Sequence, residues 1–194
     1  MYKITKPVNR EVEYARDGIK LALSKYDDMQ GQKGGKHRCE FASMFRSWRT
    51  AKFDHRKQVM IPSSGWDIDP YHCLVMQYKQ HISMDHSPCI SMRVIGEHFQ
   101  FTLNNDAGKI HISDLLPIRF NHYHDVRFSG IWNHTKNSSA PPITKIYLDG
   151  NQVAESLEPN MYENEDNIGP SDSFGPYIWE WGAAEHRTAY YRIF

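Results

Sequence analysis

Cysteine is scarce in this sequence of 194 residues. The three cysteines, Cys39, Cys73 and Cys89, are too few and too scattered for a disulfide framework, and no two of them form a C-x-x-C pair. We therefore expect buried or free thiols, because cysteine commonly behaves as a small buried hydrophobic residue.

Long apolar segments are also missing. No run is long enough to span a bilayer, and the N-terminal segment MYKITKPVNREVEYARDG lacks the apolar centre of a signal peptide. We therefore expect neither a transmembrane segment nor a secretory signal. The sequence indicates no compartment, and an extracellular or virion-associated site of action, reached by another route of delivery, remains open.

An excess of one charge is absent as well. The chain has 23 Lys and Arg residues against 23 Asp and Glu residues, so its composition gives no reason to expect a nucleic-acid or membrane partner. Its 11 histidines would make it cationic below neutral pH, which favours an acidic polymer as partner. Nothing in the composition indicates an oligomeric state.

Helical periodicity is nearly absent, and apolar residues instead tend to occupy every second position. Ile19, Leu21 and Leu23 would share one face of a strand. The segment 11–26 can also be drawn as a helix, but Gly18 lies in its middle and its second half alternates. We therefore expect a strand at 18–23.

Turn signals divide the rest of the chain into short strand-like segments. They include GQKGGK at 31–36, NNDAG at 104–108 and DGN at 149–151. Short strands with a turn about every ten residues favour an antiparallel sandwich or barrel over βαβ units. The length suits a single all-β domain covering residues 1–194.

A polar face is predicted on the strand at 73–81. Strict alternation would place Gln77, Lys79 and His81 on the same face as Cys73 and Val75, with Leu74 and Met76 opposite. Consecutive polar residues on one face indicate contact with water, so we expect a binding cleft there.

Five segments, taken in order, carry a resemblance. They are GIKLAL at 18–23, Arg38-Cys39-Glu40, VMQYK followed by SPCISMRVIG at 75–96, HDVRFSGIW to IYLDGN at 124–151, and GPYIWEWG at 175–182. Over most of its length the chain resembles the polysaccharide lyase β-jelly-roll superfamily, which includes heparin lyase I, glucuronan lyase and alginate lyases on a concanavalin A-like sandwich. The resemblance implies an antiparallel two-sheet β-jelly-roll sandwich and an acidic polysaccharide as substrate.

The resemblance also implies β-elimination at a uronate unit. In the resembled families an Arg and a Gln contact the carboxylate, while a His two residues after the Gln and a late Tyr transfer the protons. Arg38 and Gln77 match the first pair, but Lys79 stands at the His position, so the base would be Lys79 or the neighbouring His81.

The closing segment departs from the family. The family pattern Y-F-K-x-G-x-Y appears here as residues 178–184, with Glu180 at the lysine position and Ala184 at the tyrosine position. Another tyrosine would then have to protonate the leaving group. The catalytic candidates are Lys79, His81, Tyr177 and Tyr190, and the substrate-binding candidates are Arg38, Glu40, Gln77, Trp179 and Arg187.

Two other functions stay open. Because Glu180 and Ala184 replace the family residues, the chain could be a non-catalytic carbohydrate-binding or virion-type structural module. A glycoside hydrolase of the lectin-like sandwich type would need two carboxylates in one cleft, for which Glu40 and Glu180 are the candidates.

No cofactor or metal is expected. His122, His124 and Asp125, with His111 nearby, have spacing that fits a metal, but no distant ligand joins them in the sequence. A structural calcium ion is the alternative for the acidic segment with Glu163, Asp166 and Asp172, although we expect a solvated loop there.

Overall fold

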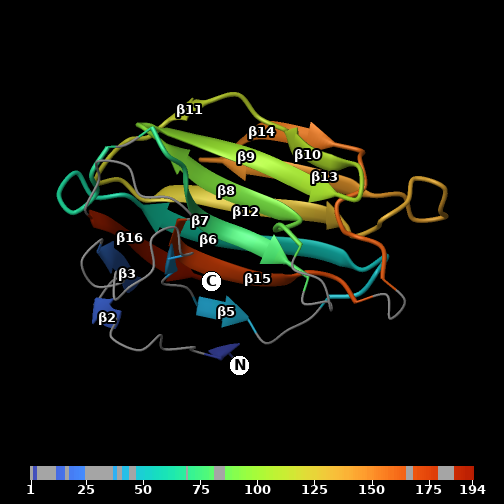
Figure 1. Ribbon diagram of the computed structural model, residues 1–194, viewed down its shortest axis with the longest axis horizontal. Coiled ribbons are helices and arrows are strands. Elements are labelled where there is room, and N and C mark those ends of the chain that lie inside the picture. The colour runs from blue at the N-terminus through green and yellow to red at the C-terminus, as the bar shows by residue number, and fades with distance from the viewer. Residues whose placement is uncertain are drawn as a thin grey trace.

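The computed structural model describes residues 2–3, 12–15, 18–24, 37–38, 41–43, 47–68, 70–80, 86–164, 168–178 and 186–194, with side chains described from residue 47 onward. All regular elements in these ranges are strands (Figure 1). The strands are β1 Tyr2–Lys3, β2 Val12–Ala15, β3 Gly18–Ser24, β4 His37–Arg38, β5 Phe41–Ser43, β6 Lys52–Met60, β7 Cys73–Lys79, β8 Ile90–Ile95, β9 His98–Asn105, β10 Gly108–His111, β11 Leu116–Pro117, β12 His124–Ile131, β13 Ile143–Leu148, β14 Asn151–Ser156, β15 Ser171–Ile178 and β16 His186–Ile193. Among the described residues no helix is long and apolar enough to cross a membrane.

The strands form two antiparallel sheets. The nine-stranded sheet has the order β1-β5-β15-β7-β8-β9-β10, with β4 beside β15 and β11 beside β9, and the seven-stranded sheet has the order β14-β13-β12-β6-β16-β3-β2. Strands far apart in the chain, such as β15 and β7, are neighbours, as a jelly roll requires. Figure 1 shows the sheets as two layers, with β7, β8 and β9 in front of β6 and β12. The predicted all-β jelly-roll sandwich is confirmed.

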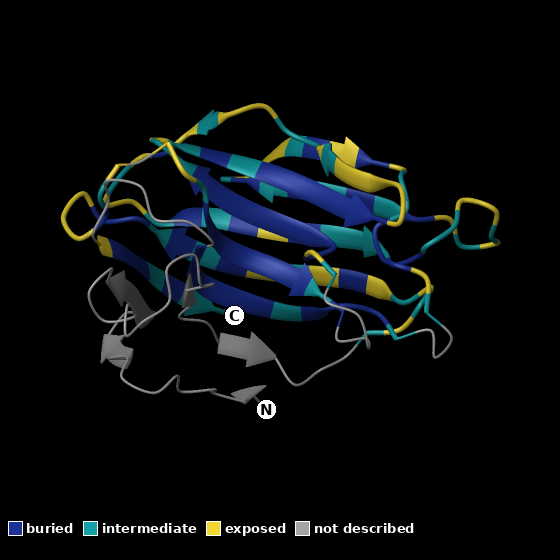
Figure 2. Ribbon diagram, in the orientation of Figure 1, coloured by how far each residue is buried: buried dark blue, intermediate teal, exposed yellow. Residues whose placement is uncertain are grey.

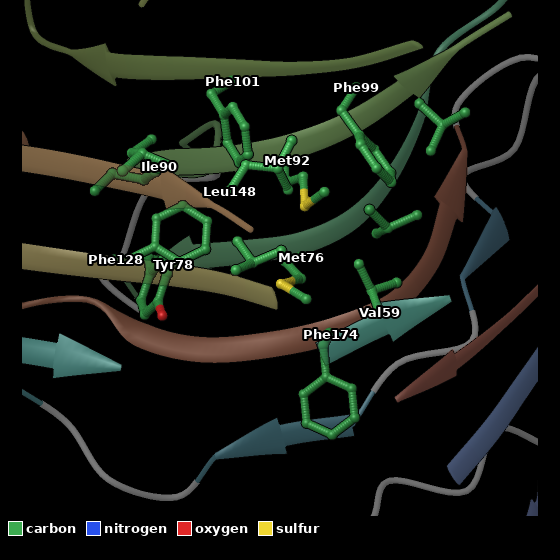
Figure 3. Close-up of a cluster of buried hydrophobic side chains, with 14 of the residues drawn as sticks. Val59, Met76, Tyr78, Ile90, Met92, Phe99, Phe101, Phe128, Leu148 and Phe174 are labelled. Carbon is green, nitrogen blue, oxygen red and sulfur yellow. The ribbon is translucent and has the colours of Figure 1, made fainter. Parts of the chain in front are cut away.

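Alternating apolar side chains fill the space between the sheets. On β8, Ile90, Met92 and Val94 are at most 2% exposed and face Phe99 and Phe101 of the neighbouring strand (Figure 3). In Figure 2 the front strands are mostly dark blue, because residues on both of their faces are buried. Burying a large apolar side chain contributes about 1.5–3 kcal/mol, so this layer accounts for much of the stability of the sandwich.

Two polar contacts cross the core between the sheets. On β6, Lys57 points inward and donates to the carboxylate of Asp172 on β15, and its Nζ lies 5.6 Å from the centre of the Phe174 ring. His55 Nδ1 lies 3.2 Å from the hydroxyl of Tyr78 on β7. Burial lowers the pKa of His55 and raises the pKa of Tyr78 well above its ordinary value. The sandwich is therefore joined by charge and hydrogen bonds as well as by apolar packing.

The expected turns at 104–108 and 149–151 are confirmed, and a further turn lies at Gly96. Gly96 between β8 and β9 has φ of 56°, and Asp149 and Gly150 between β13 and β14 have φ of 52° and 84°. Two consecutive left-handed residues are typical of the two-residue hairpin turn that Asp-Gly favours. The NNDAG segment joins β9 to β10, whereas residues 31–36 lie outside the described ranges.

Candidate functional site

Polar side chains collect on the outer face of the nine-stranded sheet, the face turned away from the core. One cross-strand row joins Ser173, Gln77, Ser91 and Thr102, because each is the register partner of the next. The Ser91 and Thr102 hydroxyls lie 2.6 Å apart, and Gln77 is only 2% exposed. These polar side chains therefore form one continuous row across four strands.

A second row lies next to the first. Tyr177 on β15 pairs with Leu74 on β7, which pairs with Arg93 on β8, which pairs with Gln100 on β9. Arg38 on β4 is the register partner of Tyr177 on its other side. The sheet therefore places two positions predicted from the sequence, Arg38 and Tyr177, side by side, with Tyr177 on the strand next to β7 and Arg38 one strand further away.

A bulge in β7 decides which residues reach this face. The register with β8 shifts between Leu74 and Met76, so Val75 and Met76 both pack in the core. Cys73 and Val75 therefore face inward, whereas Gln77 keeps the predicted outer position, paired with Ser91 and Ser173. The expectation that Cys73 and Val75 share a face with Gln77 was wrong, because one extra residue reverses the alternation.

Lys79 follows Gln77 on the outer face. Its register partner is Ser171 on β15, whose hydroxyl donates to the Lys79 carbonyl oxygen at 3.2 Å. The Lys79 side chain is half-buried. The other predicted base, His81, lies outside the described residues, as do Glu40, Trp179, Glu180 and Ala184.

The structure does not bring Tyr190 and Arg187 to the outer face of the nine-stranded sheet. Both lie on β16 of the other sheet. Tyr190 alternates with Ala189 and Tyr191, which pack in the core, so it faces away from the nine-stranded sheet. Arg187 is 1% exposed, stacks over the Trp66 ring at 5.2 Å and donates to the Asp67 carbonyl oxygen. These contacts give Arg187 a packing role.

A pocket on the outer face was missed by the sequence analysis. It has a volume of about 360 Å³ and runs along β8 and β9. Its lining consists of Tyr71, His72, Ser87, Pro88, Arg93, Asn104 and Lys109. The sequence feature that could have indicated it is Arg93, the one charged residue in the otherwise apolar strand ISMRVI, which lies next to the strand of Gln77. We call this cavity the Arg93 pocket.

Cations dominate the electrostatics of the Arg93 pocket. Burial lowers the pKa of Arg93 to about 10, and burial followed by repulsion from Arg93 lowers the pKa of Lys109. Burial, Arg93 and Lys109 together lower the pKa of His72 to about 4. Burial and the same two cations also lower the pKa of His111, which lies on β10 with Lys109. Of the described residues, none that lines the pocket is acidic.

This electrostatic environment predicts an acid-sensitive contribution to stability. The pKa of His72 is about 4 in the folded chain and about 6.5 in the unfolded chain, so between these pH values the unfolded chain binds more protons. The free energy of unfolding should therefore fall as the pH falls from about 6.5 to about 4, and His72→Gln should flatten that slope.

Urea unfolding at a series of pH values measures the effect of His72. The matched control is His134→Gln, in the loop after β12, which should keep the wild-type slope. Equal slopes in wild type and His72→Gln would contradict the prediction.

His122 and His124 lie close together, and Asp149, not Asp125, is the carboxylate beside them. Ligand atoms of His122, His124 and Asp149 lie within 4.8 Å of one another. However, His124 Nδ1 is 2.8 Å from Asp149, and its Nε2 is 3.1 Å from the backbone N–H of Arg119. The Arg119 guanidinium lies 2.8 Å from both Asp149 and His122. A guanidinium thus already balances the carboxylate that a metal ion would need.

The acidic segment proposed for calcium is divided in the structure. Asp172 lies on β15 and pairs with Lys57, and the backbone N–H of Glu163 donates to Asp106. Asp166 lies outside the described residues. Asp172 therefore neutralises a buried lysine and does not face the same site as Glu163.

Comparison with known proteins gives a family and a set of structural neighbours. Residues 2–192 match the family described as Polysaccharide lyase. The endo-β-1,4-glucuronan lyase of the fungus Trichoderma reesei superposes with a TM-score of 0.76 at 11% identity, covering 100% of this chain and 88% of that one. No curated protein matches the sequence.

Two alginate lyases share the fold. The enzyme from a Chlorella virus has a TM-score of 0.62 at 10% identity, covering 99% of this chain and 86% of that one. The enzyme from Pseudomonas aeruginosa has a TM-score of 0.56 at 10% identity, covering 93% and 82% of the two chains. At these identities the neighbours establish the fold.

Proposed function

This chain belongs to the polysaccharide lyase family, and from that premise we propose that it cleaves a uronate-containing polysaccharide by β-elimination. The observation that carries the proposal is that an amide, an amine and a phenol lie on neighbouring strands of one sheet. Gln77 and Lys79 stand on β7 beside β15, where Tyr177 pairs with Leu74 and Arg38. The glucuronan and alginate lyases among the structural neighbours support an acidic substrate.

In this reaction each group has a distinct task. Arg38 and the Gln77 amide neutralise the uronate carboxylate, which makes the C5 proton more acidic. An amine of Lys79, or the imidazole of His81, removes that proton, and the electron pair forms the C4–C5 double bond as the C4–O bond breaks. The Tyr177 hydroxyl protonates the departing glycosidic oxygen, so that the charge is balanced.

The direct test is incubation with glucuronan, alginate, heparin and chondroitin. β-Elimination yields unsaturated ends that absorb in the near ultraviolet, whereas hydrolysis yields new reducing ends without that absorption. If none of these polymers yields unsaturated ends at pH values from acid to alkaline, the proposal is contradicted.

A second candidate function is a carbohydrate-binding module without catalysis. Glu180 and Ala184 at the family's lysine and tyrosine positions favour it. This candidate is supported if the chain binds a uronate polymer saturably, loses that binding in Gln77→Ala, and releases no product. Unsaturated product from the wild-type protein would exclude it.

A further inference from the structure

Among the residues that the structure describes, no anion matches the buried cation of Arg93. The residue is 5% exposed, and Nη2 donates to the Thr102 hydroxyl at 3.2 Å. Its Nε has no hydrogen-bond partner, and the guanidinium forms no ion pair with any residue that the structure describes. A buried charge without a partner is unfavourable, so a sequence that keeps one there indicates a ligand of opposite charge.

The surroundings of Arg93 suit an anionic group. Lys109 on β10 is the register partner of Asn104, which puts its amine on the same outer face, and His72 enters from the segment before β7. Asn104 is fixed because its amide donates to the Pro88 carbonyl oxygen. A charged ligand oxygen could therefore meet two cations and a fixed polar rim.

An exposed aromatic ring lies at the same pocket. Tyr71 lines it and is 46% exposed, although large aromatic residues are usually well buried. An amphipathic ring beside a polar pocket can pack on the apolar face of a pyranose while its hydroxyl stays in water. The pocket thus combines contacts for a charge with a surface for a sugar ring.

The Arg93 pocket is separate from the proposed cleavage site, although both are on one sheet face. Arg38, Tyr177, Leu74 and Arg93 occupy one cross-strand row, so the backbones at Arg38 and Arg93 are three strand spacings apart. At about 4.8 Å per spacing this is about 14 Å, and none of Gln77, Lys79 and Tyr177 lines the pocket.

We propose that the Arg93 pocket is a second subsite, which holds the carboxylate of another uronate unit of the same polymer while Tyr71 packs against a sugar ring. The proposal rests on the proposed function for the identity of the polymer as a uronate. Its consequence is selectivity: the chain distinguishes a continuous run of uronates from a polymer with isolated ones.

Binding of defined oligosaccharides tests this subsite. Glucuronan hexasaccharide is titrated calorimetrically into wild type, Arg93→Gln, Lys109→Gln and Tyr71→Ala, at a temperature where all four are folded. A charge-assisted hydrogen bond contributes about 1.5–3 kcal/mol, so Arg93→Gln should weaken binding about 10- to 100-fold. The exposed Lys109 and the Tyr71 ring should each contribute a smaller, measurable loss.

Matched controls separate binding from general charge and folding effects. Lys52→Gln removes an exposed lysine from the other sheet and should leave the affinity unchanged. Because Arg93 is buried without an ion pair, Arg93→Gln should unfold at the same or a higher temperature than wild type. Cellohexaose, which has no carboxylates, should bind weakly to wild type and equally weakly to Arg93→Gln.

Three results would overturn the subsite: unchanged hexasaccharide affinity in both Arg93→Gln and Lys109→Gln, an equal loss in Lys52→Gln, or equal affinity of wild type for cellohexaose. A heparin-derived hexasaccharide tests whether sulfate is the ligand. If it binds far more tightly than the glucuronan hexasaccharide, and this binding depends on Arg93, the pocket recognises sulfate and the carboxylate assignment is overturned. If binding depends on Arg93 but no product forms, the subsite is supported and the lyase proposal fails. If the chain cleaves the polymer but binding does not depend on Arg93, the lyase proposal is supported and the subsite fails.

Discussion

Tyr177→Phe is expected to lower kcat on the cleaved uronate polymer by about 10²- to 10⁴-fold, the usual effect of removing a positioned general acid. The substitution keeps the ring that packs on the outer face, where Tyr177 is only 4% exposed, and removes the hydroxyl alone. KM should change little, because the sugar contacts remain. Initial rates of ultraviolet absorbance measure both constants.

The matched control for Tyr177 is Tyr147→Phe. Tyr147 is half-buried on β13 of the other sheet, where Arg127 lies 5.4 Å from its ring centre. This variant should keep the wild-type kcat. If Tyr177→Phe retains full kcat while remaining folded, Tyr177 is not the proton donor, and the hydroxyl must come from elsewhere.

Lys57→Met is expected to destabilise the fold by about 3–5 kcal/mol, because it leaves the Asp172 carboxylate buried and unpaired. The two side chains are 7% and 12% exposed, and they connect the two sheets through the core. Urea unfolding at neutral pH measures the loss as a lower midpoint. The double variant Lys57→Met/Asp172→Leu should recover most of the stability, because no buried charge then remains.

A surface ion pair supplies the control for Lys57. Lys145 and Glu155 lie 3.7 Å apart, with side chains 36% and 42% exposed. Lys145→Met should change the free energy of unfolding by less than about 1 kcal/mol. A loss in Lys57→Met no larger than this, or a double variant no more stable than the single one, would show that the buried pair contributes little.

Local signals predicted the turns and many of the strands. Asp149 and Gly150 specify their hairpin because few other residues adopt positive φ at low energy. The strand at Gly18–Ser24 was found from alternation alone. Such features depend on near neighbours in the chain, so the sequence was sufficient for them.

Strand β6 was not recognised, because most of its side chains are polar. Its outward charges, Asp54 and Arg56, bond to Arg127 and Asp125 on β12, and its inward Lys57 pairs with Asp172. All three partners are more than sixty residues away in the chain. A central strand can thus be highly charged when distant strands supply the opposite charges.

The candidate site was predicted only in part for the same reason. Gln77 and Tyr177 lie on neighbouring strands of one sheet, whereas Tyr190 and Arg187 belong to the other sheet. Sheet membership depends on long-range pairing, which residue type does not encode. Arg93 was overlooked because its burial becomes evident only when β8 lies between β7 and β9.

The bulge in β7 means that the identity of the binding face depends on a count of residues. Without Val75, strict alternation would still place Leu74 on the face of Gln77; with Val75 kept but no bulge, Cys73 and Val75 would take that face and Leu74 would turn into the core. Comparison of this strand with distant lyases therefore has to be made separately on each side of the bulge. An alignment without a gap there would match core positions of one protein with outer-face positions of another.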